Sequence, residues 1–516
     1  MASRLQKGIN KLVKTLFQSY TIRAPRQRPK AFHDAIWGTQ IFAPCEVAIL
    51  DSPLLQRLRH VYQTGLAYQV FPSARHSRFE HTIGVVATAT KMAVSINAKF
   101  LRRFPQEPPL ISPKELQELR LAALFHDCSH GLFSHASERV YSEHPWLADF
   151  KRDKPYFAEV KSSELLAYLI ITSDEFNRWW ESLRNHFKDD EVLQSCNKDA
   201  FAKLIIGKAP DDKAFLGDII NGPFDADKLD YIQRDGYFTG LKLMIDVDRL
   251  LYALDVGDVS EELPNGTKKT RRRLIISWAG VTALEQILMS KLQLYANVYQ
   301  HPKVRAAESW LETTLFRLMN EQNADVLFAT PVDFLRWTDT DFLAINESTA
   351  NINRRILMLA RSLRTRELPM RVLVISKDTV ASRDDLKNLL LDIAKGSWHF
   401  IKAGLEDLIY REVQRKHGRL NDFYIIVDFP RQPPLNEPEQ TWVQIRGSER
   451  KALMSEHFKT MEWLETFTVN KWRGHIFCPF GFEDKVRPIA KEVLQERLKL
   501  RLNPLAEQLI SEGREV

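Results

Sequence analysis

The stretch HDCSHGLFSH, residues 126–135, holds three histidines and an aspartate within ten positions. A plain hydrophobic core does not require that density of polar side chains. His126 and His130 lie four positions apart, so they share a face on a helix, and Asp127 adds a hard oxygen ligand beside an imidazole. Both His126 and Asp127 can reach one metal ion at the end of a helix. Mixed imidazole and carboxylate ligands suit iron, manganese, zinc or magnesium.

Two ligands hold a metal weakly, so further ligands are expected from other segments. The stretch RFEH, residues 78–81, places His81 just before a helix of small apolar residues. The stretch FDADKLDY, residues 224–231, offers carboxylates at the start of another helix, one face of which carries Asp227, Asp230, Tyr231, Arg234 and Asp235. Taken alone, that face is more typical of a salt-bridged helix in water. A single histidine such as His81 is likewise more typical of a satisfied polar residue.

Length and composition describe a globular protein of more than one domain. The chain has 516 residues, which indicates two or three domains, and its hydrophobic content of 44% supports a large core. No apolar run is long enough to span a membrane, and the N-terminus lacks the apolar stretch of a secretory signal. The four cysteines form no Cys-x-x-Cys pair, which argues against a zinc ribbon or a disulfide framework. We therefore expect a cytoplasmic protein.

The formal net charge of +7 is concentrated at the N-terminus. Residues 1–33 contain eight basic residues and no acidic one, which leaves a net charge of −1 on the other 483 residues. A helix is expected at residues 4–17, with Leu5, Ile9, Leu12, Val13, Leu16 and Phe17 on one face. This basic amphipathic arm is suited to contact nucleic acid or an anionic membrane. The interpretation we favour is packing of its apolar face on the body or on a partner subunit.

The pattern of predicted secondary structure changes near the last third of the chain. Residues 34–350 show mostly helical patterns, including 85–96, 164–171 and 283–299, with a turn followed by a basic strand or loop edge at 261–273. After about residue 365, short β-branched runs at 372–375, 424–427, 442–445 and 475–478 alternate with helical patterns at 385–394 and 484–502. We predict a mainly α protein with an N-terminal arm (1–33), a helical domain (34–350) and a smaller C-terminal α/β lobe (351–516).

The order His…His-Asp…Asp resembles the HD superfamily of metal phosphohydrolases. Neighbouring words narrow the resemblance to its deoxynucleoside-triphosphate triphosphohydrolase branch, which includes bacterial dGTPase-like proteins. These words are QRLR (56–59), QTG (63–65), VFP (70–72), HSRFEH (76–81), FSH (133–135), DKLDY (227–231) and YQH (299–301). The resemblance is strong over residues 34–310 and looser over the C-terminal lobe. The basic arm stands where other members of the branch carry a SAM domain.

The resemblance implies a role for each matching residue. A divalent ion of manganese, iron, magnesium or zinc is expected on His81, His126, Asp127 and Asp227. His130 and His135 are expected beside the scissile phosphate, with Glu138 in place of an aspartate. Expected substrate contacts are Arg78 and Lys228 at the phosphates, Tyr231 and Asp235 at the sugar, Gln63 at the 3′-hydroxyl and Tyr299 against a 2′-hydroxyl. The implied assembly is a homo-oligomer.

The implied reaction is attack of a metal-activated water on the α-phosphorus of a deoxynucleoside triphosphate, releasing a deoxynucleoside and tripolyphosphate. His130 or His135 protonates the leaving 5′-oxygen, and the sequence does not decide between them. One departure weakens this expectation, because Ala158 stands where members of the branch carry a histidine. Two alternatives stay open. The basic arm and residues 268–273 motivate a phosphodiesterase or nuclease acting on nucleic acid, and Ala158 motivates a nucleotide-binding scaffold with weakened catalysis.

Overall fold

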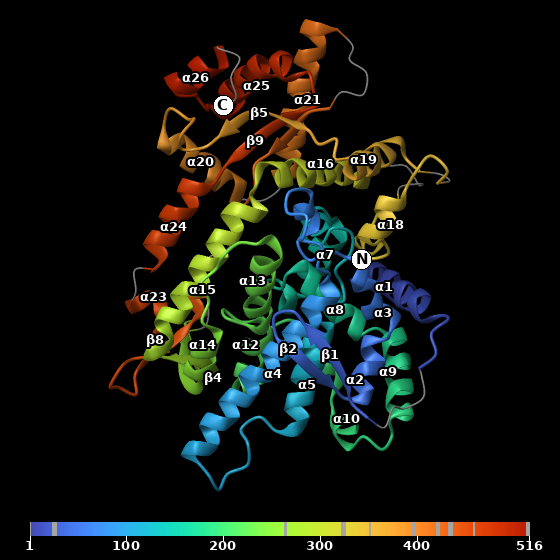
Figure 1. Cartoon of the computed structure of the whole chain (residues 1–516), viewed down its shortest axis with the longest axis vertical. Coiled ribbons are helices and arrows are strands. Elements are labelled where there is room, and N and C mark those ends of the chain that lie inside the picture. The colour runs from blue at the N-terminus through green and yellow to red at the C-terminus, as the bar shows by residue number, and fades with distance from the viewer. Residues whose placement is uncertain are drawn as a thin grey trace.

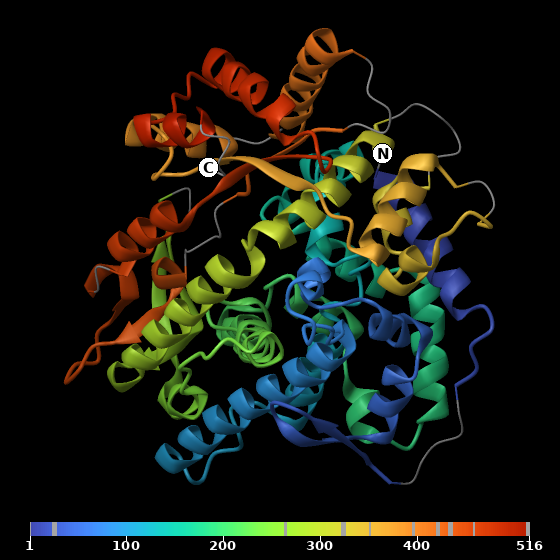
Figure 2. The ribbon, with the colours of Figure 1, turned by 45° about the horizontal axis from the view of Figure 1, so that its top comes forward.

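The computed structural model describes residues 2–22, 28–262, 266–320, 327–349, 352–394, 398–418, 424–431, 437–457 and 460–511. Within these residues the protein is mainly helical, as predicted, with small sheets (Figures 1 and 2). The basic residues Arg23 and Arg26 of the predicted arm, and residues 263–265 of the predicted turn, lie outside the described residues.

Helices run through the whole described chain. They are α1 (Ala2–Phe17), α2 (Pro44–Leu50), α3 (Pro53–Gln56), α4 (Arg78–Arg103), α5 (Pro113–Phe125), α6 (His135–Tyr141), α7 (Pro145–Asp153), α8 (Ser162–Ile171), α9 (Asp174–His186), α10 (Glu191–Ser195), α11 (Lys198–Ile205), α12 (Ala214–Asn221), α13 (Ala226–Thr239), α14 (Val247–Ala253), α15 (Val281–Leu294), α16 (Pro302–Met319), α17 (Pro331–Phe334), α18 (Asp339–Ala344), α19 (Arg354–Thr365), α20 (Arg383–Ala394), α21 (Trp398–His417), α22 (Glu437–Gln440), α23 (Met454–His457), α24 (Thr460–Lys471), α25 (Glu483–Leu498) and α26 (Pro504–Ser511). The helix predicted over 283–299 is α15 followed by a π-helical turn at Tyr295–Tyr299. The helix predicted over 484–502 ends earlier, as α25.

Three helices that meet near the centre of the molecule begin at clear sequence signals. Capping boxes start α4, between Ser77 and Glu80, and α5, between Ser112 and Glu115. The side chain of Asp225 caps α13 by accepting a backbone N–H of its first turn. α4 packs against both α5 and α13. This packing brings the first turns of α4 and α13 toward the end of α5.

The strands form three small sheets within the described residues. They are β1 (Lys30–Asp34), β2 (Gly38–Phe42), β3 (Leu254–Glu262), β4 (Lys268–Ser277), β5 (Met370–Ile375), β6 (Ile426–Asp428), β7 (Trp442–Gln444), β8 (Lys451–Leu453) and β9 (Gly474–Cys478). β1 and β2 form a hairpin, β3-β4-β7-β8 form the second sheet, and β5-β9-β6 form the third. β4 and β7 run parallel, so the C-terminal part of the chain completes a sheet that the middle of the chain begins.

Residues 34–350 hold more strand than their helical patterns predict. β2, β3 and β4 all lie in this range, and β3 pairs with β4 along its whole length. Acidic residues of β3 stand opposite basic residues of β4, as in the pairs Asp258–Arg272 and Glu261–Lys269. Cross-strand charge pairs stabilise a hairpin that has few apolar side chains. Apolar periodicity does not reveal such a hairpin, although a basic strand or loop edge was expected at the position of β4.

Two hydrophobic cores hold the fold. The larger core takes apolar side chains from Leu5 to Leu368 and also Ile426, Val443, Met454 and Phe477. The smaller core lies between residues 372 and 506, around the sheet β5-β9-β6 at the top of Figure 1. Because side chains from the last fifth of the chain enter the larger core, the C-terminal region is built into the body. The division of the chain at residue 350 stays a prediction.

The N-terminal helix α1 lies against the body (blue, on the right of Figure 1). Its Leu5, Ile9, Leu12 and Val13 are at most 4% exposed and face α3, α7, α8, α9 and α17. The expected packing of its apolar face on the body is therefore confirmed. The lysines of α1 are exposed, and contact of this basic face with nucleic acid or a membrane surface stays a prediction. Among the described residues, no helix is long and apolar enough to cross a membrane.

Candidate metal centre

The four predicted metal ligands meet where α4, α5 and α13 converge. His81 lies in the first turn of α4, His126 and Asp127 directly follow α5, and Asp227 lies in the first turn of α13. The ligand atoms of His81, His126 and Asp227 lie within 4.8 Å of one another. Asp127 Oδ1 lies 3.5 Å from His126 Nε2, and its Oδ2 lies 3.7 Å from His81 Nε2. We call these four residues the metal cluster.

The hydrogen bonds of the two histidines turn the Nε2 atom of each ring into the cluster. His81 Nδ1 donates to Asp230 Oδ2 at 2.6 Å, and His126 Nδ1 donates to the carbonyl oxygen of Ala123 at 2.7 Å. Each Nε2 therefore faces inward, and the two Nε2 atoms lie 3.4 Å apart. Electron pairs this close repel each other unless a proton or a metal ion lies between them. An outward-donating Nδ1 is the arrangement that metal-binding histidines adopt.

The charges around the metal cluster favour a bound cation. Burial opposes the charge of Asp127, but Arg78 and the neighbouring imidazoles outweigh it and hold the pKa of Asp127 well below its usual value. Burial also opposes a charge on His81, yet Asp227 and Asp230 raise the pKa of His81 to about 10, so a bound metal ion takes the place of a proton on this ring. The Asp227 side chain is 38% exposed, so the cluster opens to solvent on that side. Two carboxylates and two inward-facing imidazoles fit a divalent ion.

Asp230 orients His81 and is itself held tightly. It is fully buried and accepts from Arg234 Nε at 2.8 Å, from Arg234 Nη2 at 2.9 Å and from the indole N–H of Trp37 at 2.5 Å. Gly84 allows this close approach of α4 to α13, because a Cβ there would lie 1.9 Å from Asp230 Oδ1. In the sequence Asp230 shares a helix face with the predicted metal ligand Asp227, but nothing there indicates that it orients His81. Its position three residues after Asp227 is a signal that could have indicated this role.

A second group of side chains, His130, His135 and Glu138, lies beside the metal cluster. α6 carries His135 at its first position and Glu138 one turn later. His135 Nδ1 donates to Glu138 Oε2 at 2.9 Å, and Glu138 Oε1 accepts from the backbone N–H of Ser163 at 3.1 Å. A hydrogen bond between an imidazole and a carboxylate suits proton transfer. We call His130, His135 and Glu138 the α6 cluster.

Arg78 joins the two clusters. Its buried guanidinium donates from Nη1 to Asp127 Oδ2 at 2.5 Å, and its Nη2 lies 3.2 Å from His135 Nε2. His130 Nε2 lies 3.4 Å from Asp127 Oδ1, and burial lowers the pKa of His130 to about 3. His130 is therefore neutral at pH 7 and enclosed. The His135 side chain is 61% exposed and open to an incoming molecule.

α6 begins with a strained backbone. Phe133 has φ 46° and Ser134 has φ 52°, both in the left-handed region that favours glycine. The buried Asp339 accepts from the backbone N–H of Phe133 at 2.5 Å and from that of Tyr62 at 2.8 Å, and Ser134 Oγ donates to the carbonyl oxygen of Tyr62. Such strain costs roughly 1–3 kcal/mol per residue and persists only where surrounding contacts fix it. The entry into α6 is therefore set by contacts from distant segments.

Three residues expected at the nucleoside lie close to His76. Asp235, 4% exposed, accepts from the Tyr299 hydroxyl, and its Oδ1 lies 2.8 Å from His76 Nε2. Gln63 donates its backbone N–H to the carbonyl oxygen of His76 at 3.0 Å. The Gln63 Oε1 atom is buried and has no hydrogen-bond partner among the described residues. His76 has no role in the sequence-based assignment, although it lies within the HSRFEH word.

Lys228 is directed toward the start of its own helix. Its Nζ donates to Asp225 Oδ2 at 2.7 Å and to the carbonyl oxygen of Gly222 at 2.8 Å. A contact of Lys228 with a phosphate requires these bonds to break or to be shared. Tyr231 is half-buried against the larger core, and burial raises the pKa of its hydroxyl well above the usual value. Tyr231 therefore stays neutral and offers an O–H donor.

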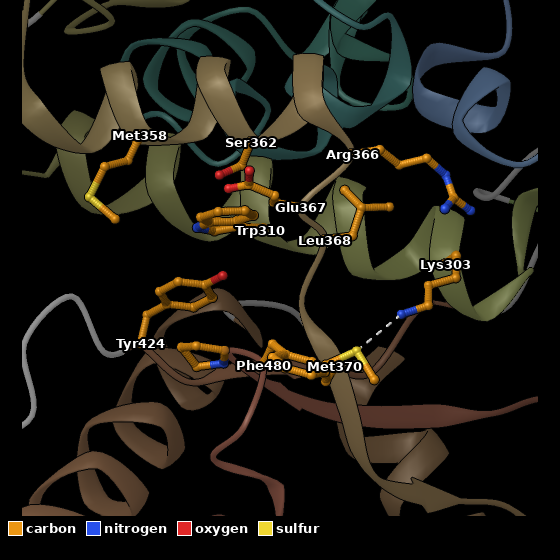
Figure 3. Close-up of a pocket in the computed structure, with 11 residues that line it drawn as sticks. Lys303, Trp310, Met358, Ser362, Arg366, Glu367, Leu368, Met370, Tyr424 and Phe480 are labelled. Carbon is orange, nitrogen blue, oxygen red and sulfur yellow. Dashed lines mark hydrogen bonds between the residues drawn. The ribbon is translucent and has the colours of Figure 1, made fainter.

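A pocket of about 500 Å³ lies apart from both clusters, between α16, α19 and the ends of β5 and β9 (Figure 3). Trp310 stacks on Tyr424 there, with ring centroids 4.6 Å apart, and Phe480 is 80% exposed. Lys303 and Arg366 also line the pocket. No local sequence pattern marks it, because its lining residues come from distant segments.

Two family models match the chain. Residues 78–205 match the HD domain, and residues 245–502 match the HD associated region. The HD match contains His81, His126 and Asp127, and Asp227 lies between the two matched regions.

The chain is similar to several curated proteins over part of its length. The chain is 30% identical over 331 residues to an uncharacterised protein of Methanocaldococcus jannaschii, covering 64% of this chain and 58% of that protein. It is 27% identical over 409 residues to the deoxynucleoside triphosphate triphosphohydrolase SAMHD1 homolog of Dictyostelium discoideum, covering 75% and 69%. It is 27% identical over 283 residues to human deoxynucleoside triphosphate triphosphohydrolase SAMHD1, covering 53% and 42%. The chain thus spans only part of the length of each relative.

A solved structure supports the fold. A hypothetical protein from Aquifex aeolicus matches with a TM-score of 0.56 and 21% sequence identity, covering 90% of this chain and all of that one. At this identity the likeness concerns the fold alone.

Proposed function

Because the chain belongs to the family of HD-domain proteins with an HD-associated region, we propose that it is a metal-dependent phosphohydrolase that cleaves deoxynucleoside triphosphates to deoxynucleosides and tripolyphosphate. The observation that carries the proposal is the metal cluster, in which two histidines direct Nε2 at each other across 3.4 Å beside two carboxylates. The choice of substrate rests on distant relatives named as deoxynucleoside triphosphate triphosphohydrolases and on the residues around Asp235.

His81, His126, Asp127 and Asp227 would hold the ion, which is manganese, iron, magnesium or zinc. Such an ion supplies activation of a water molecule for attack on phosphorus. Asp230 fixes the ring of His81, and the Ala123 carbonyl fixes that of His126, so both Nε2 atoms stay directed at one point.

Arg78 and His135 act on the phosphate side of the reaction. The buried guanidinium of Arg78 reaches from Asp127 to His135 and stabilises negative charge that develops on the phosphoryl oxygens. We assign to His135 the delivery of a proton to the departing 5′-oxygen, because it is exposed and Glu138 holds its Nδ1. For this step its Nε2, which accepts from Arg78 Nη2, first takes up a proton from solvent and leaves the guanidinium. His130, which is 4% exposed, supports the site from behind Asp127.

The nucleoside end is assigned to the group around Asp235. Its carboxylate, the Tyr299 hydroxyl and Gln63 Oε1, which has no hydrogen-bond partner in the described part of the chain, are suited to bind sugar hydroxyls. The ring of Tyr299 occupies space that a 2′-hydroxyl needs in a ribonucleotide. Tyr231 offers its O–H to the sugar, and Lys228 joins the phosphates after release from Asp225.

The test is turnover by purified protein loaded separately with Mn²⁺, Mg²⁺ or Fe²⁺. Each deoxynucleoside and ribonucleoside triphosphate is supplied, and nucleoside and tripolyphosphate are separated by chromatography. Tripolyphosphate from deoxynucleotides alone, absent with Asp127→Asn, supports the proposal. Turnover of single-stranded DNA instead favours a phosphodiesterase, and nucleotide binding without turnover favours a scaffold. Light scattering on the same samples tests the predicted homo-oligomer.

A further inference from the structure

α6 is too short to hold its own position. It has seven residues, His135–Tyr141, and its backbone enters through two strained residues. An isolated helix of this length is not stable in water, so tertiary contacts must fix its rotation and place. The rotation of α6 decides where His135 and Glu138 point. It matters more in this chain because Ala158, exposed on the surface, offers no imidazole in place of the family histidine.

Arg139, the residue after Glu138, ties α6 to α16. Its Nη2 lies 2.6 Å from Glu308 Oε2 and 2.7 Å from Glu312 Oε1, and its Nε donates to Glu312 Oε1 at 2.8 Å. The Glu312 side chain is 3% exposed, and that of Glu308 is 12% exposed. Charge-assisted bonds to buried carboxylates are strong and directional. They hold one side of α6 against α16.

Arg305 extends this contact to the C-terminal strand β6. It donates from Nε to Asp428 Oδ2 at 3.0 Å and from Nη2 to Asp428 Oδ1 at 2.7 Å, a two-point contact with a fully buried carboxylate. The same guanidinium donates from Nη1 to Glu308 Oε2 at 2.8 Å. Arg139 and Arg305 thus share Glu308. We call Arg139, Glu308, Glu312, Arg305 and Asp428 the ionic bridge.

A second contact holds the chain just beyond α6. His399 of α21 lies with Nδ1 2.7 Å from Glu143 Oε1 and Nε2 3.9 Å from Glu312 Oε2. Glu143 follows α6 by two residues. α16 therefore contacts α6 through Arg139, and α21 contacts the segment after α6 through Glu143.

We propose that Arg139 is a positioning residue, and that the ionic bridge lets the C-terminal region hold His135 and Glu138 in place beside the metal cluster. The bridge crosses from the HD domain, which contains Arg139, to the HD-associated region, which contains its other four members. In this arrangement the HD-associated region keeps α6 rigid without contacting the substrate. The inference rests on the proposed function for its activity readout.

The experiment compares ion pairs on two sides of one helix. Arg139→Met and Asp428→Asn cut the ionic bridge, and Arg139→Lys keeps the charge. The matched control is Arg317→Met, because Arg317 lies on α16 and binds the buried Glu406 at 3.0 Å, but its partner belongs to α21 rather than to α6. For each variant kcat, KM, bound metal per chain and Tm are measured. Arg139→Met is also combined with His135→Ala.

We expect Arg139→Met to lower kcat by about 10–100-fold with KM changed less than about threefold, since a misplaced acid–base group costs that much without weakening binding. Asp428→Asn lowers kcat in the same direction, Arg139→Lys recovers part of the loss, and all variants keep their metal. In the His135→Ala background Arg139→Met has no further effect on kcat. Arg317→Met stays within about twofold of the unaltered protein at a comparable loss of Tm.

Two results overturn the inference. One is an equal fall of kcat in Arg139→Met and Arg317→Met, and the other is an undiminished effect of Arg139→Met in the His135→Ala background. If the unaltered protein turns over no nucleotide, the proposed function fails, and amide hydrogen exchange of residues 135–141 decides the inference separately. Faster exchange there in Arg139→Met than in Arg317→Met supports the positioning role, and equal exchange overturns it.

Discussion

The metal cluster and the α6 cluster lie side by side and contain the same kinds of side chain, but their ring nitrogens face different partners. In the metal cluster both Nδ1 atoms donate outward, to Asp230 and to the Ala123 carbonyl, and the Nε2 atoms face each other and the carboxylates of Asp127 and Asp227. In the α6 cluster His135 Nδ1 donates inward to Glu138.

Both groups have the spacing of metal ligands, so spacing alone does not separate them. The direction of the hydrogen bonds does. In the metal cluster two Nε2 atoms from different segments converge with two carboxylates, which favours a metal ion, whereas in the α6 cluster one imidazole donates to one carboxylate, which favours proton transfer. Glu138 is moreover already engaged by Ser163, which leaves the α6 cluster few free donor atoms. The comparison predicts that substitutions in the two clusters have separable effects on metal content and turnover.

The largest expected effect comes from Asp127→Asn. It removes a carboxylate of the metal cluster and the partner of Arg78 together, so bound metal falls below one ion per chain and turnover falls on the order of 10³-fold or more. Metal analysis by mass spectrometry and initial rates measure the two quantities. Full metal content in this variant would contradict the assignment of the cluster.

A smaller loss is expected from His135→Ala. Removing one acid–base group lowers kcat by about 10²–10³-fold while the metal content stays that of the unaltered protein. Glu138→Gln serves as the companion variant, because it keeps the size of the side chain and removes its charge. Loss of metal in either variant would show that the two clusters are one metal site and would remove the contrast drawn above.

Asp230→Asn tests whether outward hydrogen bonding creates the metal cluster. The amide cannot accept from His81 and Arg234 as the carboxylate does, so we expect metal affinity to weaken by about 10–100-fold. Titration with Mn²⁺ followed by calorimetry gives the affinity. Arg317→Met, which cuts the ion pair with the buried Glu406 between α16 and α21, is the control and leaves the affinity unchanged.

The smallest expected effect is a change in stability, and it concerns His475, a histidine outside both clusters. Both ring nitrogens of His475 are buried without a hydrogen-bond partner among the described residues, and burial lowers its pKa to about 3. Its neutral form stabilises the fold fully above pH 6.5, and this contribution is lost as the pH falls toward 3. Between pH 7 and pH 5 the unaltered protein should lose about 2 kcal/mol more unfolding free energy than His475→Leu. Urea unfolding at the two pH values measures this, and equal losses would refute it.

The sequence predicts those parts of the molecule that have local signals. The helices α1, α4 and α8 follow apolar periodicity, and the words around His81, His126 and Asp227 single out the residues that the structure brings together. The long-range parts have no such signal. Arg305 and Asp428 lie 123 positions apart, and nothing near either residue indicates the other.

Lys228 shows a different limit of the sequence. Its position in the DKLDY word predicts a phosphate contact, but the neighbouring Asp225 binds it more closely than any group of the metal cluster does. A motif states which residue types stand near one another, whereas competition among nearby charges decides where a long side chain points.

The parallel pairing of β4 with β7 has a consequence for how the chain folds during synthesis. Ile275 of β4 pairs with Trp442, so one edge of β4 stays open until more than 160 further residues have been made. An unpaired edge strand is a template for pairing with other chains. In a nascent chain the three residues of this edge, 275–277, are therefore open to pairing with other chains until the last third of the chain arrives. Truncation before residue 442 should produce insoluble protein even though the metal cluster is complete by residue 227.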